Sequence, residues 1–103
     1  MSKYRNIKSG GFDSKKEERR YHELRLLEKA GQIADLKCQQ KIPLMGANGP
    51  VTTPTGRKSH YRADFTYTEN GKHIVEDVKG YRTDVYLLKR GILAAQGIEV
   101  RET

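Results

Sequence analysis

The sequence predicts one α/β domain with the order helix, strand, β-hairpin, helix, strand. Asn70-Gly71 separates two short apolar-rich runs, which is a strong signal for a β-hairpin. Two stretches with apolar residues at helical spacing each follow a residue suited to cap a helix, Ser14 and Thr83. The chain has 103 residues, of which 35% are hydrophobic. That length and composition allow one small core and no second domain.

The first helix is expected to start after Ser14, because Ser14 and Glu17 have the spacing of a capping box. Gly31 is suited to the left-handed residue that follows a helix. Residues 1–11 are polar and basic, so we expect a flexible N-terminal arm there and a folded domain over residues 12–103. The apolar or aromatic positions of this helix are Tyr21, Leu24, Leu27 and Ala30.

Three strands are expected in the middle of the chain. The first lies within residues 33–44, and the hairpin strands lie within residues 61–68 and 72–80. Residues 45–59 are rich in Gly, Pro and Thr and are expected to form a loop.

The second helix is predicted to begin after Thr83 and to end at Gly97, with a last strand over residues 98–101. Its expected apolar stripe consists of Val85, Leu88, Ile92 and Ala95, with Leu93 at the edge.

The charge balance favours an acidic polymer as partner. The formal net charge is +7 at pH 7, from 20 Lys and Arg residues against 13 Asp and Glu residues. Nucleic acid is therefore a better candidate than a membrane, although many small domains carry solvated lysines without such a role. No apolar run approaches the roughly 18 residues that span a bilayer.

The cysteine and histidine content indicates the redox compartment and the type of metal ion that the chain could bind. Cys38 is the single cysteine, so an internal disulfide is impossible, which fits a reducing cytoplasm. Three scattered histidines and one cysteine make a structural zinc site a poor expectation. Any metal would be a hard cation held by oxygen ligands, of the magnesium type.

The hairpin gathers charged groups on adjacent strands. Asp64 lies on the first strand, and Glu76, Asp77 and Lys79 lie near the end of the second. Side chains alternate between the faces of a strand, so Asp77 and Lys79 share one face and Glu76 lies on the other. Burying such a cluster is costly unless a divalent metal compensates. Asp77 is therefore preferred to Glu76 as a ligand, a choice that a bulge would reverse.

This pattern resembles the PD-(D/E)xK nuclease superfamily, whose motif is an acidic residue on one strand and an acid-x-lysine on the next. Ala63-Asp64-Phe65 stands where Pro-Asp is usual, and Asp77-Val78-Lys79 stands for acid-x-lysine. The missing proline is not a ligand. The likeness is greatest to a small phage-encoded branch related to phage junction-resolving endonucleases. Its motifs are matched by Phe12-Asp13-Ser14-Lys15-Lys16-Glu17 and Asp77-Val78-Lys79-Gly80, and the likeness extends from about Phe12 to about Arg101.

The resemblance implies a restriction-endonuclease-like αβββαβ core, with a mixed sheet flanked by helices, and a Mg²⁺- or Mn²⁺-dependent endodeoxyribonuclease activity. Asp64 would be the central metal ligand and Asp77 the second. The backbone carbonyl of Val78 would complete the protein's share of the coordination, and Glu17 would be an outer carboxylate. Lys79 would orient or activate the attacking water. This chemistry suits phosphodiester hydrolysis, because hard cations stabilise the charge that develops on phosphate.

Alternatives remain for the candidate residues. Glu17 could serve only the helix cap, although it lies on the face of Tyr21 and Leu24. Gln39 is a further candidate that could approach the site from the preceding strand, or it could be an ordinary solvated glutamine. The whole chain could also be a non-catalytic nucleic-acid-binding module that keeps the fold.

Contacts to DNA are expected from basic and aromatic residues near the motif. Tyr86 could instead belong to the core, and Lys89 and Arg90 could form an ordinary solvated helix face. A domain of this size would cover little DNA, and a junction-cutting enzyme needs two active sites, so we expect a homodimer. The candidate DNA-binding residues are Arg62, Tyr81, Arg82, Lys89 and Arg90.

Overall fold

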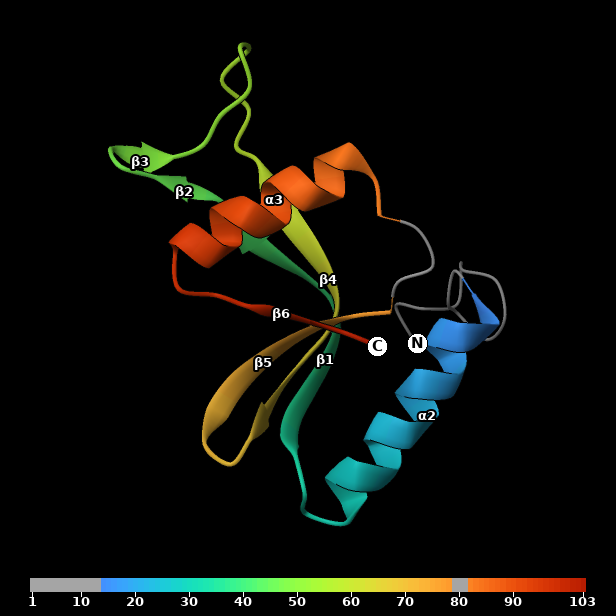
Figure 1. The fold of residues 1–103 in the computed structure, drawn as a ribbon. Helices are drawn as coiled ribbons and strands as arrows, with labels where there is room; N and C mark the ends of the chain where they lie inside the picture. Colours follow the sequence, from blue (N-terminus) through green and yellow to red (C-terminus); the bar gives the residue numbers. More distant parts are fainter. Residues whose placement is uncertain (1–13, 79–81) are drawn as a thin grey trace.

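The computed structural model describes residues 14–78 and 82–103. The arm expected over residues 1–11 lies outside these residues, as do Phe12 and three motif-region positions, Lys79, Gly80 and Tyr81. The helices are α2 (Lys15–Lys29) and α3 (Asp84–Ala95) (Figure 1). The strands are β1 (Ala34–Pro43), β2 (Met45–Gly46), β3 (Gly49–Pro50), β4 (His60–Glu69), β5 (Lys72–Asp77) and β6 (Val100–Glu102).

The main sheet has four strands in the order β1-β4-β5-β6. β1 pairs with β4 and β4 with β5 in antiparallel fashion, whereas β5 and β6 are parallel. The parallel pair requires a crossover, and α3 lies on that connection. This arrangement confirms the predicted α/β class, the αβββαβ order and the mixed sheet.

Both predicted helix starts are confirmed by their caps. The Ser14 Oγ accepts a hydrogen bond from the Glu17 backbone N–H at 3.1 Å, and the Thr83 Oγ1 accepts one from the Tyr86 N–H at 3.0 Å. Each bond satisfies a donor that the first helical turn leaves without a partner. Gly31 follows α2 with a φ of 79°, the left-handed conformation expected of it.

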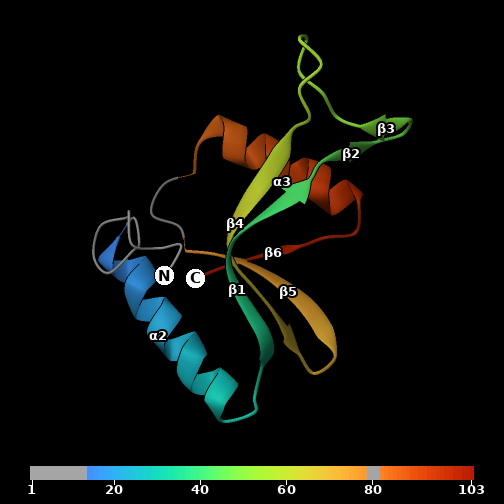
Figure 2. The same ribbon diagram turned by 180° about the vertical axis from the view of Figure 1, so that it is seen from behind.

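The segment 45–59 contains more structure than the loop expected from the sequence. β2 and β3 pair with each other, and Thr52 forms a bridge with Lys58. Ala47 and Asn48 form the turn between β2 and β3, so Asn48-Gly49 does not take the two central turn positions that Asn70-Gly71 takes in the β4–β5 hairpin. Figures 1 and 2 show this segment extending away from the four-stranded sheet beside α3.

The core consists of two clusters, one on the side of each helix. The α3 cluster includes Tyr61 and Ala63 of β4, and the α2 cluster includes Phe65 and Tyr67 of the same strand. β4 therefore passes from one cluster to the other at Asp64. Figures 1 and 2 show the strands of the sheet converging in the middle of the molecule, where the two halves meet.

The apolar stripe expected on α3 is wrong for Val85 and Leu88, whereas Ile92 packs against the α3 cluster. Tyr86 and Leu93 are the buried residues of this helix, while Val85 and Leu88 are 61% and 66% exposed. Tyr86 and Leu93 lie seven residues apart and so share a face. Burial of the Tyr86 ring is favoured because its hydroxyl donates a 2.6 Å hydrogen bond to the Glu102 carboxylate at the sheet edge.

Within the part of the chain that the structure describes, neither helix combines the length and the apolar character that crossing a membrane requires.

Candidate functional site

Asp64 and Asp77 face each other at the end of the β4–β5 hairpin. The pairing of Phe65 with Glu76 places Asp64 opposite Asp77. The Asp64 backbone N–H donates to Asp77 Oδ1 at 2.9 Å, and the Val78 N–H donates to Asp64 Oδ2 at 2.9 Å. Each carboxylate thus accepts a backbone hydrogen bond from the other strand.

Glu17 and Gln39 form a second contact next to this pair. The Gln39 Nε2 donates to Glu17 Oε2 at 2.8 Å, and Glu17 is only 4% exposed. The pairing of Cys38 with Phe65 and of Gln40 with Ala63 places Gln39 opposite Asp64 on the neighbouring strand. Gln39 has a φ of 56°, an unusual value for a residue other than glycine.

Two predictions are borne out by these contacts. Glu17 lies on the buried face of α2, as its spacing from Leu24 predicted. Gln39 does approach this region from the preceding strand. Two contacts thus lie on neighbouring elements: Glu17 of α2 with Gln39 of β1, and Asp64 of β4 with Asp77 of β5.

The donor set is suited to a hard cation. Carboxylate and backbone carbonyl oxygens are the ligands that Mg²⁺ and Mn²⁺ prefer, and a carboxylate can accept several bonds, so one backbone donor does not exhaust it. Over residues 14–78 and 82–103, however, no three His, Cys, Asp or Glu side chains form a group that could hold a metal ion. Asp64 and Asp77 are therefore two carboxylates of the kind such a cation takes, and Glu17 does not join them in a three-residue group.

Glu76 has a different role from Asp77. Its side chain has no exposed surface, and Arg20 binds both of its oxygens, with Nε to Oε2 at 2.7 Å and Nη2 to Oε1 at 3.1 Å. The hydroxyls of Tyr67 and Thr103 also donate to it, at 2.5 and 3.0 Å. Burial by itself would raise the pKa of Glu76, but the hydrogen bonds from Arg20 and Tyr67 outweigh it and hold the pKa below its ordinary value. The β5 pairing is continuous up to this point, so Asp77, not Glu76, lies with Asp64.

Comparison with known protein families gives a match over residues 1–103 to the family described as "Protein of unknown function (DUF1064)". The chain belongs to the DUF1064 family. No curated protein and no solved structure matches it. These comparisons support neither the likeness to PD-(D/E)xK nucleases nor a phage origin.

The ion pair between Arg20 and Glu76 in this DUF1064 protein was not predicted from the sequence. Arg20 lies three residues after Glu17 on α2, a spacing that places the two on the same side of the helix. That spacing is a signal for an inward-facing arginine. The acid that it meets, 56 residues away, could not be found from spacing.

A second missed cluster surrounds Glu102 on β6. Arg82 Nη2 and Arg90 Nη1 lie 2.6 and 3.0 Å from its carboxylate oxygens, and the Tyr86 hydroxyl also donates to it. The hydrogen bonds from Arg82 and Tyr86 lower the pKa of Glu102 to about 2. Arg82 and Arg90, both predicted to contact DNA, therefore hold the last strand to the α3 region in this structure.

The other predicted DNA contacts are placed differently. The Lys89 Nζ donates to the His60 backbone carbonyl at 2.8 Å. Arg62 is exposed on β4, and Tyr81 lies outside the described residues. Among the described residues, Arg62 forms no ion pair, and its side chain is exposed to solvent. It is therefore the member of the expected set that is best placed to contact a ligand from solution.

Proposed function

We propose that this DUF1064 protein is a metal-dependent DNA endonuclease that hydrolyses phosphodiester bonds, with branched or structured DNA as its candidate substrate. The observation that supports it best is the Asp64–Asp77 pair, two carboxylates held opposite each other by reciprocal backbone hydrogen bonds at 2.9 Å. The chain's likeness to small phage-encoded nucleases, and with it a phage origin, belongs to the same proposal.

In this proposal, Asp64, Asp77 and the Val78 carbonyl would hold Mg²⁺ or Mn²⁺. The ion would neutralise charge on the phosphate and lower the pKa of a bound water. The chain's own contribution is positioning. The Asp64 N–H fixes the Asp77 carboxylate, the Val78 N–H fixes that of Asp64, and Gln39 orients Glu17. Lys79, which follows directly in the sequence, would orient the attacking water.

A non-catalytic nucleic-acid-binding module is the second candidate. The net charge of +7 favours both candidates equally. Burial of Glu17 and Asp77, at 4% and 2% exposure, favours the enzyme. Buried acids cost stability and repel phosphate, so a protein that only binds nucleic acid gains nothing from them.

A cleavage assay separates the two candidates. Supercoiled plasmid, linear duplex and a four-way junction are incubated with the protein and Mg²⁺, Mn²⁺ or EDTA. The endonuclease proposal predicts nicking or cleavage with metal and none with EDTA. Asp64→Asn and Asp77→Asn should each abolish it, whereas Asp35→Asn, an exposed acid-to-amide change on β1, should not. Binding without metal-dependent cleavage of any substrate would instead support the second candidate.

A homodimer and a cytoplasmic setting also remain proposals. The apolar residues Val85, Leu87 and Leu88 are exposed on α3, and an exposed apolar group of this kind supports a contact with a second copy of the chain. Cys38, the single cysteine of the sequence, is buried, which suits a reducing compartment.

A further inference from the structure

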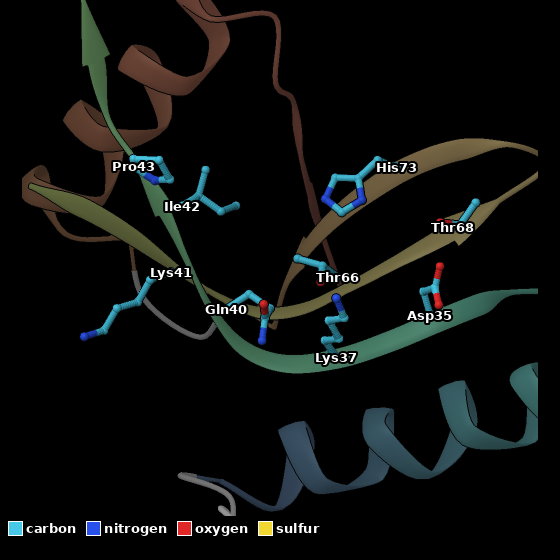
Figure 3. A pocket seen from close by; sticks show the side chains of 9 residues that line it. All are labelled: Asp35, Lys37, Gln40, Lys41, Ile42, Pro43, Thr66, Thr68 and His73. Carbon is cyan, nitrogen blue, oxygen red and sulfur yellow. The ribbon is translucent and has the colours of Figure 1, made fainter. Parts of the chain in front are cut away.

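A groove lies on the main sheet, across strands β1, β4 and β5. Its volume is about 280 Å³. Figure 3 shows Lys37 of β1, Thr66 of β4 and His73 of β5 directed toward the same space, with residues from adjacent positions along the strands completing the lining. The polar and basic side chains that line it include Lys37, Gln40, Lys41, Thr66, Thr68 and His73.

The groove carries more positive than negative groups. Lys37 and Lys41 are exposed, and Asp35 is the acid among the lining residues. Lys41 also lies directly opposite Arg62, another exposed cation, in the β1–β4 register. Like charges directly opposite each other destabilise a sheet. An anion bound between them would remove that cost.

These cations differ from the arginines elsewhere in the fold. Arg20, Arg82, Arg90 and Arg101 each form an ion pair with a carboxylate. Within the described residues, no ion pair involves the three cations of the groove region, Lys37, Lys41 and Arg62. Their charge is therefore available to a ligand from solution.

The groove passes beside the candidate site. Thr66 lies two residues after Asp64 on β4, and Gln40 directly follows Gln39 on β1. The lining extends in one direction toward Thr68 and His73, near the β4–β5 turn, and in the other toward Ile42 and Pro43. A chain of phosphates lying in the groove would thus lead to the carboxylates.

We propose that this groove binds the sugar-phosphate backbone of one nucleic-acid strand and leads it to the Asp64–Asp77 pair, an inference that rests on the proposed nuclease function. Lys37 and Lys41 contribute charge to the phosphates, and the Thr66 and Thr68 hydroxyls and the Gln40 amide contribute hydrogen-bond donors. Contacts of this kind fix the position of a strand without reading its sequence.

The test measures binding apart from cleavage. Fluorescence anisotropy of a fluorescein-labelled single-stranded oligonucleotide is recorded in EDTA over a range of salt concentrations, with the full chain carrying Asp77→Asn. Adding Lys37→Gln and Lys41→Gln should weaken binding on the order of tenfold and reduce the salt-dependence slope by about 0.7 for each lysine. The matched control, Lys29→Gln with Lys58→Gln, removes the same charge from exposed positions outside the groove and should change binding far less.

Two results would overturn the groove proposal. One is an unchanged affinity and salt slope in the Lys37→Gln/Lys41→Gln variant, and the other is an equal loss in the control, which would show an effect of net charge alone. Failure of the nuclease proposal would look different, since the groove variant would still lose binding while the wild-type chain cleaved no substrate with Mg²⁺ or Mn²⁺. Thermal unfolding of each variant confirms that the substitutions leave the fold intact.

Discussion

Arg20 on α2 and Glu76 on β5 form an ion pair with two contacts, at 2.7 and 3.1 Å, around a carboxylate that has no exposed surface. Thr103 at the end of the described chain donates to the same carboxylate at 3.0 Å. This pair therefore ties α2 and the C-terminal residues to the middle of the sheet, directly beside the candidate site.

Removing the charge of Glu76 should destabilise the protein strongly. Glu76→Gln leaves Arg20 without its buried partner, and a broken buried pair typically costs about 3 kcal/mol or more. The free energy of unfolding, measured by urea denaturation and circular dichroism, should fall by that order. Glu23→Gln is the control, because Glu23 binds the same arginine at 3.0 Å from an exposed position and should cost less than about 1 kcal/mol. Equal losses in the two variants would contradict this assignment.

The neighbouring residue Asp77 should show the opposite behaviour. In Asp77→Asn, the side-chain oxygen can still accept the Asp64 N–H, so the fold should be retained with a change in unfolding free energy of about 1 kcal/mol or less. Metal-dependent cleavage should be lost because a charged ligand is gone. Parallel measurements of the melting temperature and of plasmid nicking check both parts. Full nicking activity in Asp77→Asn would exclude Asp77 as a ligand.

Acid should destabilise the protein through Glu76 and Glu102. The pKa of Glu102 falls from its ordinary 4.5 to about 2 in the folded chain, and that of Glu76 is also lowered. A lowered pKa contributes stability that is present above pH 4.5 and is lost as the pH falls toward 2. The free energy of unfolding should therefore decrease across this interval. Glu102→Gln should flatten the decrease, and an unchanged pH dependence in that variant would contradict the assignment.

The sequence predicted those features that depend on local patterns. Ser14, Thr83 and Asn70-Gly71 specify helix starts and a turn through their own backbone contacts, and these features are confirmed. Which face of α3 is buried could not be predicted in the same way. That face depends on the hydrogen bond from Tyr86 to Glu102, which lies on a strand later in the chain.

In the candidate site, too, local patterns were predicted from the sequence and long-range contacts were not. The alternation of side chains along a strand predicted that Asp77 and Glu76 lie on opposite faces of β5, and the pairing of β5 with β4 is regular up to Glu76. The Gln39–Glu17 and Arg20–Glu76 contacts join residues far apart in the chain, which no spacing in the sequence records. Arg82 and Arg90, which interleaved basic and aromatic residues suggested as DNA contacts, also form ion pairs with Glu102 from a later strand, and their spacing does not record these pairs.

Removing the Tyr61 hydroxyl should stabilise the protein. Over the described residues, the Tyr61 Oη is the buried side-chain polar atom without a hydrogen-bond partner. Tyr61→Phe removes this group and keeps the ring beside Tyr86, so the free energy of unfolding should rise by about 1 kcal/mol. Tyr67→Phe is the matched control and should be destabilising, because the Tyr67 hydroxyl donates to Glu76 at 2.5 Å. A loss of stability in Tyr61→Phe would show that its hydroxyl has a partner in solution.

The exposed apolar residues of α3 should mediate the proposed self-association. Leu88 is 66% exposed, so Leu88→Glu can remove apolar contact area without disturbing the core, and it should shift the chain toward the monomer. Light scattering coupled to size-exclusion chromatography measures this shift over a range of protein concentrations. Leu26→Glu is a close control, because Leu26 on α2 is 68% exposed and its substitution changes charge and polarity equally. A dimer that survives Leu88→Glu but dissociates in Leu26→Glu would assign the interface to α2, and a wild-type chain that is monomeric at every concentration would remove the dimer proposal itself.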